Sequence, residues 1–347
     1  MKRIAGSVGI ACVMMTGRLA AQQPAPPPQV KVGGVVYAQY LYQLGDTAAH
    51  GNNFDVTRAY VNVTGALGEK VGVRVTSDLY RVADGSLALR LKYAYATYTP
   101  KGSPLTFKLG EMQTPWLDYE ETLWDYRMQG TTPLDRAGYL TSSDLGVGVD
   151  GSWSGDAINM QVGLYNGEGY SKTPGDQRKD VAGRVSARLL ATDDGSRTGG
   201  VRVTAFGQYG TPTGGGVRQR YVGQVSYRSK LLTLAGEGAI LRDRLDDPPA
   251  PALPDPATRK GRLLSAFGVL RVPNQPFAII ARVDDLDPDT DAANNRQTRL
   301  IGGVSWQASP NLRLLADIDH VSYEGGAPSP AAYATRTQGL VQAQVTF

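Results

Sequence analysis

The chain has 347 residues, of which 41% are hydrophobic and 42 are glycines, and its formal net charge is +4. No window supplies the roughly 18 consecutive apolar residues that a membrane-spanning helix requires. Cys12 is the only cysteine, so disulfide bonds cannot stabilise the fold. Many glycines and short apolar runs favour an all-β protein.

The N-terminus has the layout of a secretory signal peptide. Basic residues precede the apolar segment 4–15, and Ala21 ends a site of small residues. We therefore expect residues 1–21 to be a signal peptide that is cut after Ala21, and residues 22–29 to be a proline-rich periplasmic leader. A short buried helix is the alternative interpretation of the apolar segment.

The positive net charge depends on this expected signal peptide. Lys2, Arg3 and Arg18 all lie in it, and their removal lowers the net charge from +4 to +1. A nearly neutral mature chain does not present the basic surface that binds nucleic acids. We therefore expect no nucleic-acid partner, and we expect neither a cofactor nor a metal site.

The remainder of the chain contains sixteen segments with the composition of β-strands. The segments are roughly 30–44, 54–67, 70–81, 87–99, 105–112, 145–154, 157–166, 180–190, 201–209, 217–228, 231–241, 261–272, 277–284, 298–307, 312–323 and 335–347. Their connections alternate between short turns and generally longer loops, and the turn at 191–200 is an unusually long member of the short set. This alternation is typical of outer-membrane β-barrels, and an even number of strands places both chain ends on the short-turn side.

Alternation within the strands predicts which solvent each face meets. In the segment 87–99, Leu91 and Tyr93 share one face, whereas Arg90 and Lys92 share the other. An arginine on the lipid face at the membrane midplane costs roughly 2–4 kcal/mol, so the arginines should point inward. Because backbone groups in lipid must all be paired, the strands must close. The sequence therefore predicts a closed antiparallel transmembrane β-barrel of about 16 strands over residues 30–347.

The last strand ends the chain on an aromatic residue. Val341, Ala343, Val345 and Phe347 share one face of an alternating segment. This ending resembles the closing strand of Gram-negative outer-membrane barrels, in which the terminal aromatic is read by the barrel assembly machinery. Because amphipathic rings prefer the membrane interface, we expect an aromatic girdle on the short-turn side. Its members would be Trp153, Tyr227, Trp306 and Phe347.

Several short motifs occur in an order that resembles the phosphate-selective porin O and P family. They are RAYVNV (58–63), LKYAY (91–95), KLGEMQTPW (108–116), SDLGV (143–147), VGLYNGEGY (162–170) and DVAGR (180–184). The resemblance covers most of the mature chain and is more specific in its first half. It implies a homotrimeric, sixteen-stranded outer-membrane porin for passive diffusion of small hydrophilic solutes, often anions. Such a barrel would contact the lipid bilayer and lipopolysaccharide.

The longest loop, Gln113 to Asp144, has 32 residues and follows the fifth strand. Porins fold a constriction loop into the lumen from this position, so we expect this loop to fold inward. The candidate constriction residues are Trp116, Tyr119, Glu120, Glu121, Trp124 and Arg127. Glu120 and Glu121 would face a basic wall and set up a transverse field. Alternatively, these acids solvate the loop or pair with Arg136.

Basic residues outnumber acids on the predicted inward faces. The candidate pore-lining and anion-contacting residues are Arg58, Arg74, Arg90, Lys92, Lys108, Arg184, Arg188, Arg202, Arg218 and Arg220. A guanidinium keeps its charge and matches carboxylate or phosphate oxygens in a fork, so this lumen should favour anions, and small anionic or neutral solutes are the expected partners. Pairing with a neighbouring acid or tyrosine is the alternative for each. The outer loops carry many aspartates that repel phosphate at low ionic strength, so the sequence does not specify phosphate.

Two other classes of outer-membrane protein compete with a porin. A barrel hydrolase requires a catalytic histidine beside a serine or an acid, and only His50 and His320 are available. The run His320-Val321-Ser322 lies near an outer rim, but its spacing alone does not reveal a catalytic arrangement, so we expect no catalytic residues. The second class is a receptor, adhesin or energised transporter. An energised transporter would require an N-terminal plug domain, for which residues 22–29 are far too short, and an adhesin would be expected to have larger outer loops.

Overall fold

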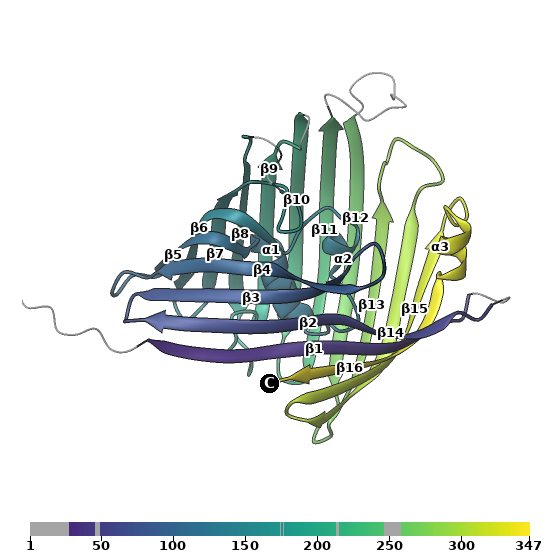
Figure 1. The fold of residues 1–347 in the computed structure, drawn as a ribbon, viewed down its shortest axis with the longest axis horizontal. Helices are drawn as coiled ribbons and strands as arrows, with labels where there is room; N and C mark the ends of the chain where they lie inside the picture. The colour runs from purple at the N-terminus through teal and green to yellow at the C-terminus, as the bar shows by residue number, and fades with distance from the viewer. Residues whose placement is uncertain (1–27, 46–48, 174, 176, 213–214, 246–257) are drawn as a thin grey trace, which may run out of the picture.

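The computed structural model describes residues 28–45, 49–173, 175, 177–212, 215–245 and 258–347 (Figure 1). The expected signal peptide, and all but the last two residues of the expected leader, lie outside these ranges. Within them, no helix has the length and apolar character needed to cross a membrane.

Sixteen strands form one closed antiparallel barrel, in which each strand pairs with its sequence neighbours and β1 pairs with β16 (Figure 1). The first eight are β1 (Gln29–Gln43), β2 (Asn52–Leu67), β3 (Val71–Arg81), β4 (Leu87–Tyr98), β5 (Leu105–Gln113), β6 (Ser143–Trp153), β7 (Ile158–Tyr165) and β8 (Asp180–Leu190). The last eight are β9 (Gly200–Gly210), β10 (Gly216–Arg228), β11 (Leu232–Leu245), β12 (Thr258–Arg271), β13 (Phe277–Asp287), β14 (Gln297–Ser309), β15 (Leu312–Tyr323) and β16 (Thr337–Thr346). The prediction of a closed all-β antiparallel barrel of about sixteen strands is confirmed.

The expected and observed strands agree in number and order, and they differ mainly at their ends. The largest difference is at β11, which continues to Leu245 instead of ending at Leu241. Its ladder with β12 extends to the pair Arg244 and Thr258, so backbone hydrogen bonding carries both strands beyond the apolar alternation. Apolar–polar alternation in the sequence predicts only the part of a strand that lies in the membrane. It does not predict the residues by which the strand continues into polar surroundings.

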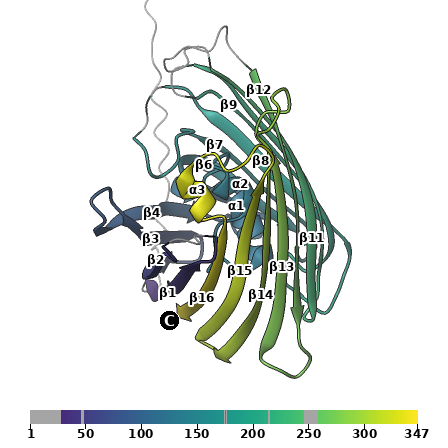
Figure 2. The same ribbon diagram turned by 90° about the vertical axis from the view of Figure 1, so that its right-hand side faces the viewer.

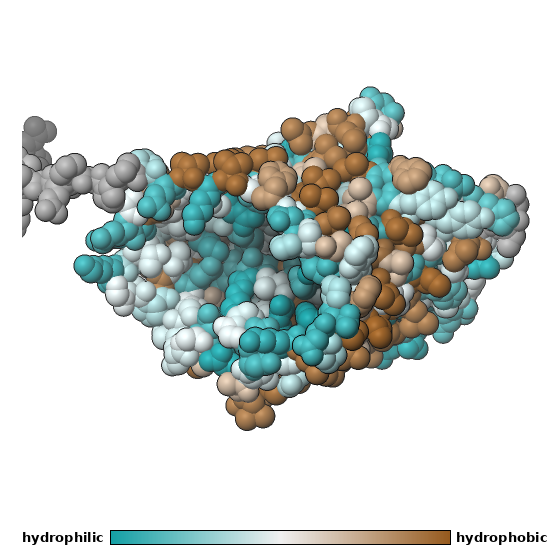
Figure 3. Space-filling model, turned by 90° about the horizontal axis from the view of Figure 1, so that it is seen from below, coloured by the Kyte–Doolittle hydropathy of each residue, from teal (hydrophilic) through white to brown (hydrophobic). Residues whose placement is uncertain are grey.

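The outer wall is apolar and the interior is hydrophilic, as the alternation predicts. Leu89 and Leu109 on the outer faces are 68% and 64% exposed, whereas inward Thr76 and Ser186 are fully buried. Figure 3 shows hydrophilic side chains lining the hollow and hydrophobic ones on the outer wall. Trp306 lies on the outer face at the turn end of β14, where its ring stacks on that of Phe277 at 6.4 Å.

The prediction for the second half of β4 is wrong. The ladder between β3 and β4 pairs Thr76 with Tyr93 but Ser77 with Leu91, so Lys92 is an extra, unpaired residue. This β-bulge shifts the alternation by one residue. Tyr93, expected to face lipid, is therefore buried inside the barrel, with the Arg74 guanidinium 4.6 Å from its ring centre.

The loop after β5 folds into the barrel, which confirms the inward-folded constriction loop. It contains two short helices, α1 (Pro115–Trp124) and α2 (Pro133–Arg136), and both lie within the ring of strands in two perpendicular views (Figures 1 and 2). Pro115 occupies the first turn of α1, and Asp125 ends the helix in a left-handed conformation with φ of 59°. A third helix, α3 (Pro330–Ala334), precedes β16.

The seam between β1 and β16 closes at the C-terminal residue. The Gly34 amide donates to the Phe347 carbonyl at 2.9 Å, and the Phe347 amide donates to the Gly34 carbonyl at 3.1 Å. Phe347 is 62% exposed on the outside of the barrel beside β1. A Cβ at position 34 would lie 2.4 Å from both the Tyr60 carbonyl oxygen and the Phe347 ring, so only glycine fits this close approach.

Substitution Gly34→Ala should destabilise the folded barrel. The added methyl group must displace backbone of β2 as well as the Phe347 ring, and overpacking of this kind costs roughly 1–3 kcal/mol. Urea-unfolding midpoints of the barrel refolded in detergent would measure the loss. Gly223→Ala is the matched control, because its Cβ would meet no atom within 4 Å. Equal midpoints for the two variants would contradict a seam that requires glycine.

Candidate functional site

The apolar side of α1 fixes the constriction loop to one part of the wall. Trp116 packs on Phe206 of β9 at a ring-centre distance of 5.8 Å, and Trp124 packs edge-on against Phe267 of β12 at 5.0 Å. Trp116 and Tyr119 are fully buried, and Trp124 is almost so. These aromatic rings, expected to shape the constriction, therefore anchor the loop instead of facing the passage.

Two predicted pore-lining arginines serve the same anchoring purpose. Arg184 is 4% exposed and donates to the Pro115 carbonyl at 3.1 Å and to Asn159 Oδ1 at 2.7 Å. Arg202 is fully buried and donates to the Gly199 carbonyl at 2.9 Å. Their prediction as solute contacts is therefore corrected, because their donors are used within the wall. Arg188 donates to the Gly155 carbonyl at 3.1 Å, close to the periplasmic turns.

The long turn between β8 and β9 (residues 191–199) contacts the polar side of α1. It lies on the short-turn side of the barrel, which is expected to face the periplasm, and is called the periplasmic turn. Arg197 of this turn donates to Asp118 Oδ2 at 2.7 Å, to the Asp118 carbonyl at 2.6 Å and to Thr122 Oγ1 at 2.9 Å. Arg228 at the end of β10 donates to the Thr122 carbonyl at 2.7 Å and to Asp194 of the turn at 2.8 Å. Burial alone would raise the pKa of the Asp118 carboxyl, but Arg197 beside it holds this pKa below its ordinary value.

Neither Arg197 nor Asp194 was among the candidate residues from the sequence. The only available signal was the unusual length of the turn at 191–200, which now has a structural reason. A turn as short as the others on this side of the barrel would not reach the constriction loop, whereas this one reaches the polar side of α1. Arg228, which the turn holds through Asp194, donates to the Thr122 and Leu123 carbonyls in the last turn of that helix, where backbone carbonyls lack intrahelical partners.

Glu120 and Glu121 point to different surroundings, although they are adjacent. Glu120 is fully buried with its carboxyl beside that of Glu237 on β11; burial first, and this second acid next, raise the pKa of Glu120 well above its usual value. Glu121 instead accepts from Arg127 Nε at 2.8 Å. The expectation that both acids face the basic wall is therefore corrected to Glu121 alone.

Glu121 lies on the side of the loop that faces β2 to β4. Its electrostatic neighbours are Arg127 of the loop, followed by Lys92 and Arg58 of these strands, and together they hold the pKa of the Glu121 carboxyl below its ordinary value despite burial. Arg127 also pairs with Asp135 of α2 at 3.3 Å. The structure thus brings an acidic and a basic group of the loop opposite the cations of the wall.

The wall itself combines cations with tyrosine rings. Arg58 lies over the Tyr60 ring at 5.0 Å, and Lys92 Nζ donates to the Tyr60 hydroxyl at 2.6 Å. Arg74 stacks on Tyr93 and donates to Asn62 Oδ1 at 2.9 Å. Within the described part of the chain, none of these three cations has a carboxylate within ion-pair distance. They are held by neutral partners, which leaves the guanidinium charges of Arg58 and Arg74 uncompensated, whereas Lys92 is fully buried.

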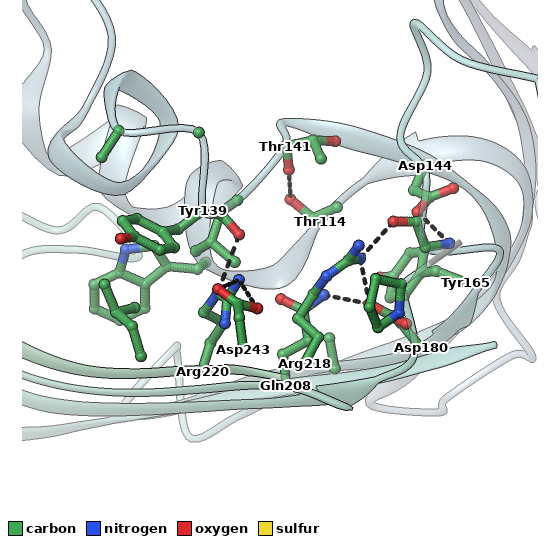
Figure 4. A pocket seen from close by; sticks show the side chains of 18 of the residues that line it. Thr114, Tyr139, Thr141, Asp144, Tyr165, Asp180, Gln208, Arg218, Arg220 and Asp243 are labelled. Carbon is green, nitrogen blue, oxygen red and sulfur yellow. Dashed lines mark hydrogen bonds and ion pairs between the residues drawn. The ribbon is translucent and has the colours of Figure 1, made fainter. Parts of the chain in front are cut away.

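The other predicted cations are paired with acids. Arg90 pairs with Asp78 at 3.2 Å, and Lys108 pairs with Asp150 at 2.5 Å. Nearer the outer mouth, Arg218 pairs with Asp180 at 3.1 Å and Arg220 pairs with Asp243 at 2.8 Å; Figure 4 shows these two pairs. For each basic residue, the sequence left pairing with a neighbouring acid as an alternative to solute contact. The structure shows this pairing for these four residues. The described residues include no group of three or more potential metal ligands.

The sequence model of the family described as phosphate-selective porin O and P matches residues 30–193 of this chain. The resemblance to this family is confirmed. No curated protein matches the chain. The matched range covers the basic wall and the constriction loop and ends at the start of the turn after β8, so the wall and the loop carry the porin sequence pattern.

Solved porins share the fold at low sequence identity. An anion-selective porin from Comamonas acidovorans has a TM-score of 0.68 at 11% identity, with 92% of this chain and 100% of that chain covered. In-vitro folded OmpT of Vibrio cholerae, in a trimer form, has a TM-score of 0.64 at 10% identity, with 93% and 100% covered. Salmonella typhi OmpF in complex with daunomycin has a TM-score of 0.62 at 12% identity, with 92% and 97% covered. At these identities the similarity shows the fold alone.

Substitution Arg197→Gln should loosen the constriction helix. The variant loses the donors to Asp118 and Thr122, and a contribution of ~1 kcal/mol for such a partly exposed charged contact corresponds to about fivefold faster hydrogen exchange of the α1 amides. Channel current should become noisier at the same time. The control is Arg81→Gln, which removes an exposed ion pair with Asp55 at the outer ends of β2 and β3. Unchanged exchange in Arg197→Gln would contradict a clamp from the periplasmic turn.

Proposed function

We propose that the protein is an outer-membrane porin through which small hydrophilic solutes diffuse passively, with a modest preference for anions. The closed barrel with a hydrophilic interior, the inward loop and the porin sequence pattern support this function. The observation that carries the anion preference is the uncompensated charge of Arg58 and Arg74, which face the loop from β2 and β3.

The partners of these cations decide their effect on a passing solute. A guanidinium paired with a carboxylate presents little net charge, whereas one held by an amide, a hydroxyl or an aromatic ring keeps its full charge. Arg74 is fixed by Asn62, Thr76 and Tyr93 in this way. Anions would therefore pass along the tyrosine-lined wall, while Glu121 on the loop opposes it and creates a field across the passage.

We further propose how the chain is processed and which partners it contacts. Residues 1–21 would be removed as a signal peptide, residues 22–29 would form a periplasmic leader, and residues 30–347 would form the porin domain. A homotrimer is supported by the trimer form of the OmpT structure with the same fold. The exposed terminal Phe347 would contact the assembly machinery, and the apolar outer wall would contact lipid and lipopolysaccharide.

One observation favours the hydrolase alternative. His320 Nε2 lies 3.1 Å from Ser322 Oγ, and His320 Nδ1 lies 2.7 Å from Thr337 Oγ1, so a nucleophile, a base and an orienting group are in hydrogen-bond contact. The orienting group is a hydroxyl and not a carboxylate, so it does not stabilise an imidazolium as an acid would. We therefore rank a porin first, and the hydrolase second.

Substitution of both Arg58 and Arg74 by Gln should shift the reversal potential toward cations. Each cation attracts a solute charge by about 1 kcal/mol at 4 Å in water, so the anion-to-cation permeability ratio should fall severalfold. Planar-bilayer recordings in a potassium chloride gradient would measure it. Arg296→Gln at the outer rim, whose guanidinium is already paired with Asp285, removes one positive charge by the same substitution and should change the ratio little. An unchanged ratio in the double variant would contradict the basic wall.

Ser322→Ala tests the second candidate. If the protein is only a porin, wild-type and variant should both fail to hydrolyse short-chain p-nitrophenyl esters and should conduct equally. Ester hydrolysis by the wild-type barrel that is lost in Ser322→Ala and in His320→Ala would instead establish the hydrolase.

A further inference from the structure

A second site lies beside the passage, near the outer mouth. A cavity of about 810 Å³ is bounded by the constriction loop, the loop after β7 and the inner faces of β8 to β12 (Figure 4). Its volume falls within the range of small-molecule sites in proteins. Trp116, Phe206 and Leu241 belong both to its lining and to the buried cluster that fixes the loop to the wall. The cavity therefore lies against β8 to β12, whereas the uncompensated cations are on β2 and β3.

The charges that line this cavity balance. The cationic members are Lys172, Arg218, Arg220 and Arg259, and the anionic members are Asp144, Glu168, Asp180 and Asp243. Arg220 donates to both oxygens of Asp243, at 2.8 and 3.0 Å. Arg218 and Gln208 both donate to Asp180 Oδ2, at 3.1 and 2.6 Å. An anion at Arg218 or Arg220 would have to break such a pair, and the equal numbers of lining cations and anions leave the cavity without the net attraction of the basic wall.

Three polar atoms of the lining remain without a hydrogen-bond partner among the residues that the structure describes. They are the Trp116 indole Nε1, Gln208 Oε1 and Glu168 Oε2. The first is a donor and the other two are acceptors, and a buried polar group without a partner costs roughly 1–3 kcal/mol. These three atoms have almost no accessible surface, so a ligand must match the other donors and acceptors of the lining, and a hydroxyl can do so because it donates and accepts.

Apolar surfaces complete the lining. The Tyr139 ring is partly exposed, the Arg220 guanidinium lies 5.0 Å from its centre, and Pro212 and Pro288 contribute on the side of the strands. Rings and prolines offer flat apolar contact to carbon-bound hydrogens, and the paired charges offer the donors and acceptors that orient a ligand.

We infer that this cavity binds a neutral polyhydroxylated solute of monosaccharide to disaccharide size. Its hydroxyls would donate to the remaining lone pairs of Asp180 and Asp243 and accept from the free N–H groups of Arg218, without breaking either ion pair. A carboxylate meets Arg218 and Arg220 already paired with aspartates, in a lining whose charges balance overall, and a zwitterion would compete with both existing pairs. The inference goes beyond the porin function, because binding at this site does not depend on which ions pass the basic wall.

Saturation-transfer NMR and calorimetry on the purified wild-type barrel would test this inference with maltose, benzoate and glycine betaine as probes. Maltose should bind saturably, and benzoate and betaine should bind at least tenfold more weakly. Gln208→Ala should weaken maltose binding severalfold, since it removes a polar side chain of the lining that orients Asp180, without changing charge. Asp243→Asn should weaken maltose and strengthen benzoate, because it leaves Arg220 without its carboxylate. Asp285→Asn, on the outer face of β13, is the charge-matched control and should bind all three probes as the wild type does.

Absence of maltose binding, tighter binding of benzoate or betaine by the wild type, or equal maltose binding in wild type and Gln208→Ala would each overturn the inference. Bilayer conductance in potassium chloride, measured on the same preparations, separates this result from the porin function. A barrel that conducts but does not bind maltose lacks the site and remains a porin. A barrel that binds maltose but does not conduct has the site and contradicts the porin.

Discussion

Every backbone polar group that meets lipid must be hydrogen bonded within the protein, and the whole structure depends on this constraint. It requires the sheet to close, and closure places β16 against β1 with Phe347 paired to Gly34. It also separates two environments, since one face of each strand meets lipid and the other meets the lumen. The arginines are then confined to the inside, where they become available for selectivity or for holding the loop.

These inward cations fall into three groups according to their partners. Arg58 and Arg74 rest on neutral groups and keep their charge, with the buried Lys92 beside them on the Tyr60 hydroxyl. Arg218 and Arg220 are neutralised by aspartates at the outer cavity. Arg184 and Arg202 use their hydrogen-bond donors on backbone carbonyls of the loop and of the turns. A count of basic residues therefore overstates the field in the lumen, and the first group alone supports the anion preference.

The constriction is held from two directions that are far apart in the sequence. Aromatic packing fixes one side of α1 to the wall, and Arg197 and Arg228 hold its polar side from the periplasmic end. Helices as short as this one are marginal in isolation, so tertiary contacts supply its stability. The position of Glu121 relative to the wall thus depends on a turn that does not itself line the constriction.

The sequence by itself determined the number of strands, their order, the closed barrel and the inward face of most arginines, because period-two alternation between lipid and water is written locally in each strand. It also indicated the constriction loop by its length and aromatic content. Only the tertiary structure decided that Tyr93 turns inward, since a bulge depends on how β3 pairs with β4. Likewise, the separation of Glu120 from Glu121 and the clamp of Arg197 on Asp118 arise from contacts between distant segments, which no local pattern encodes.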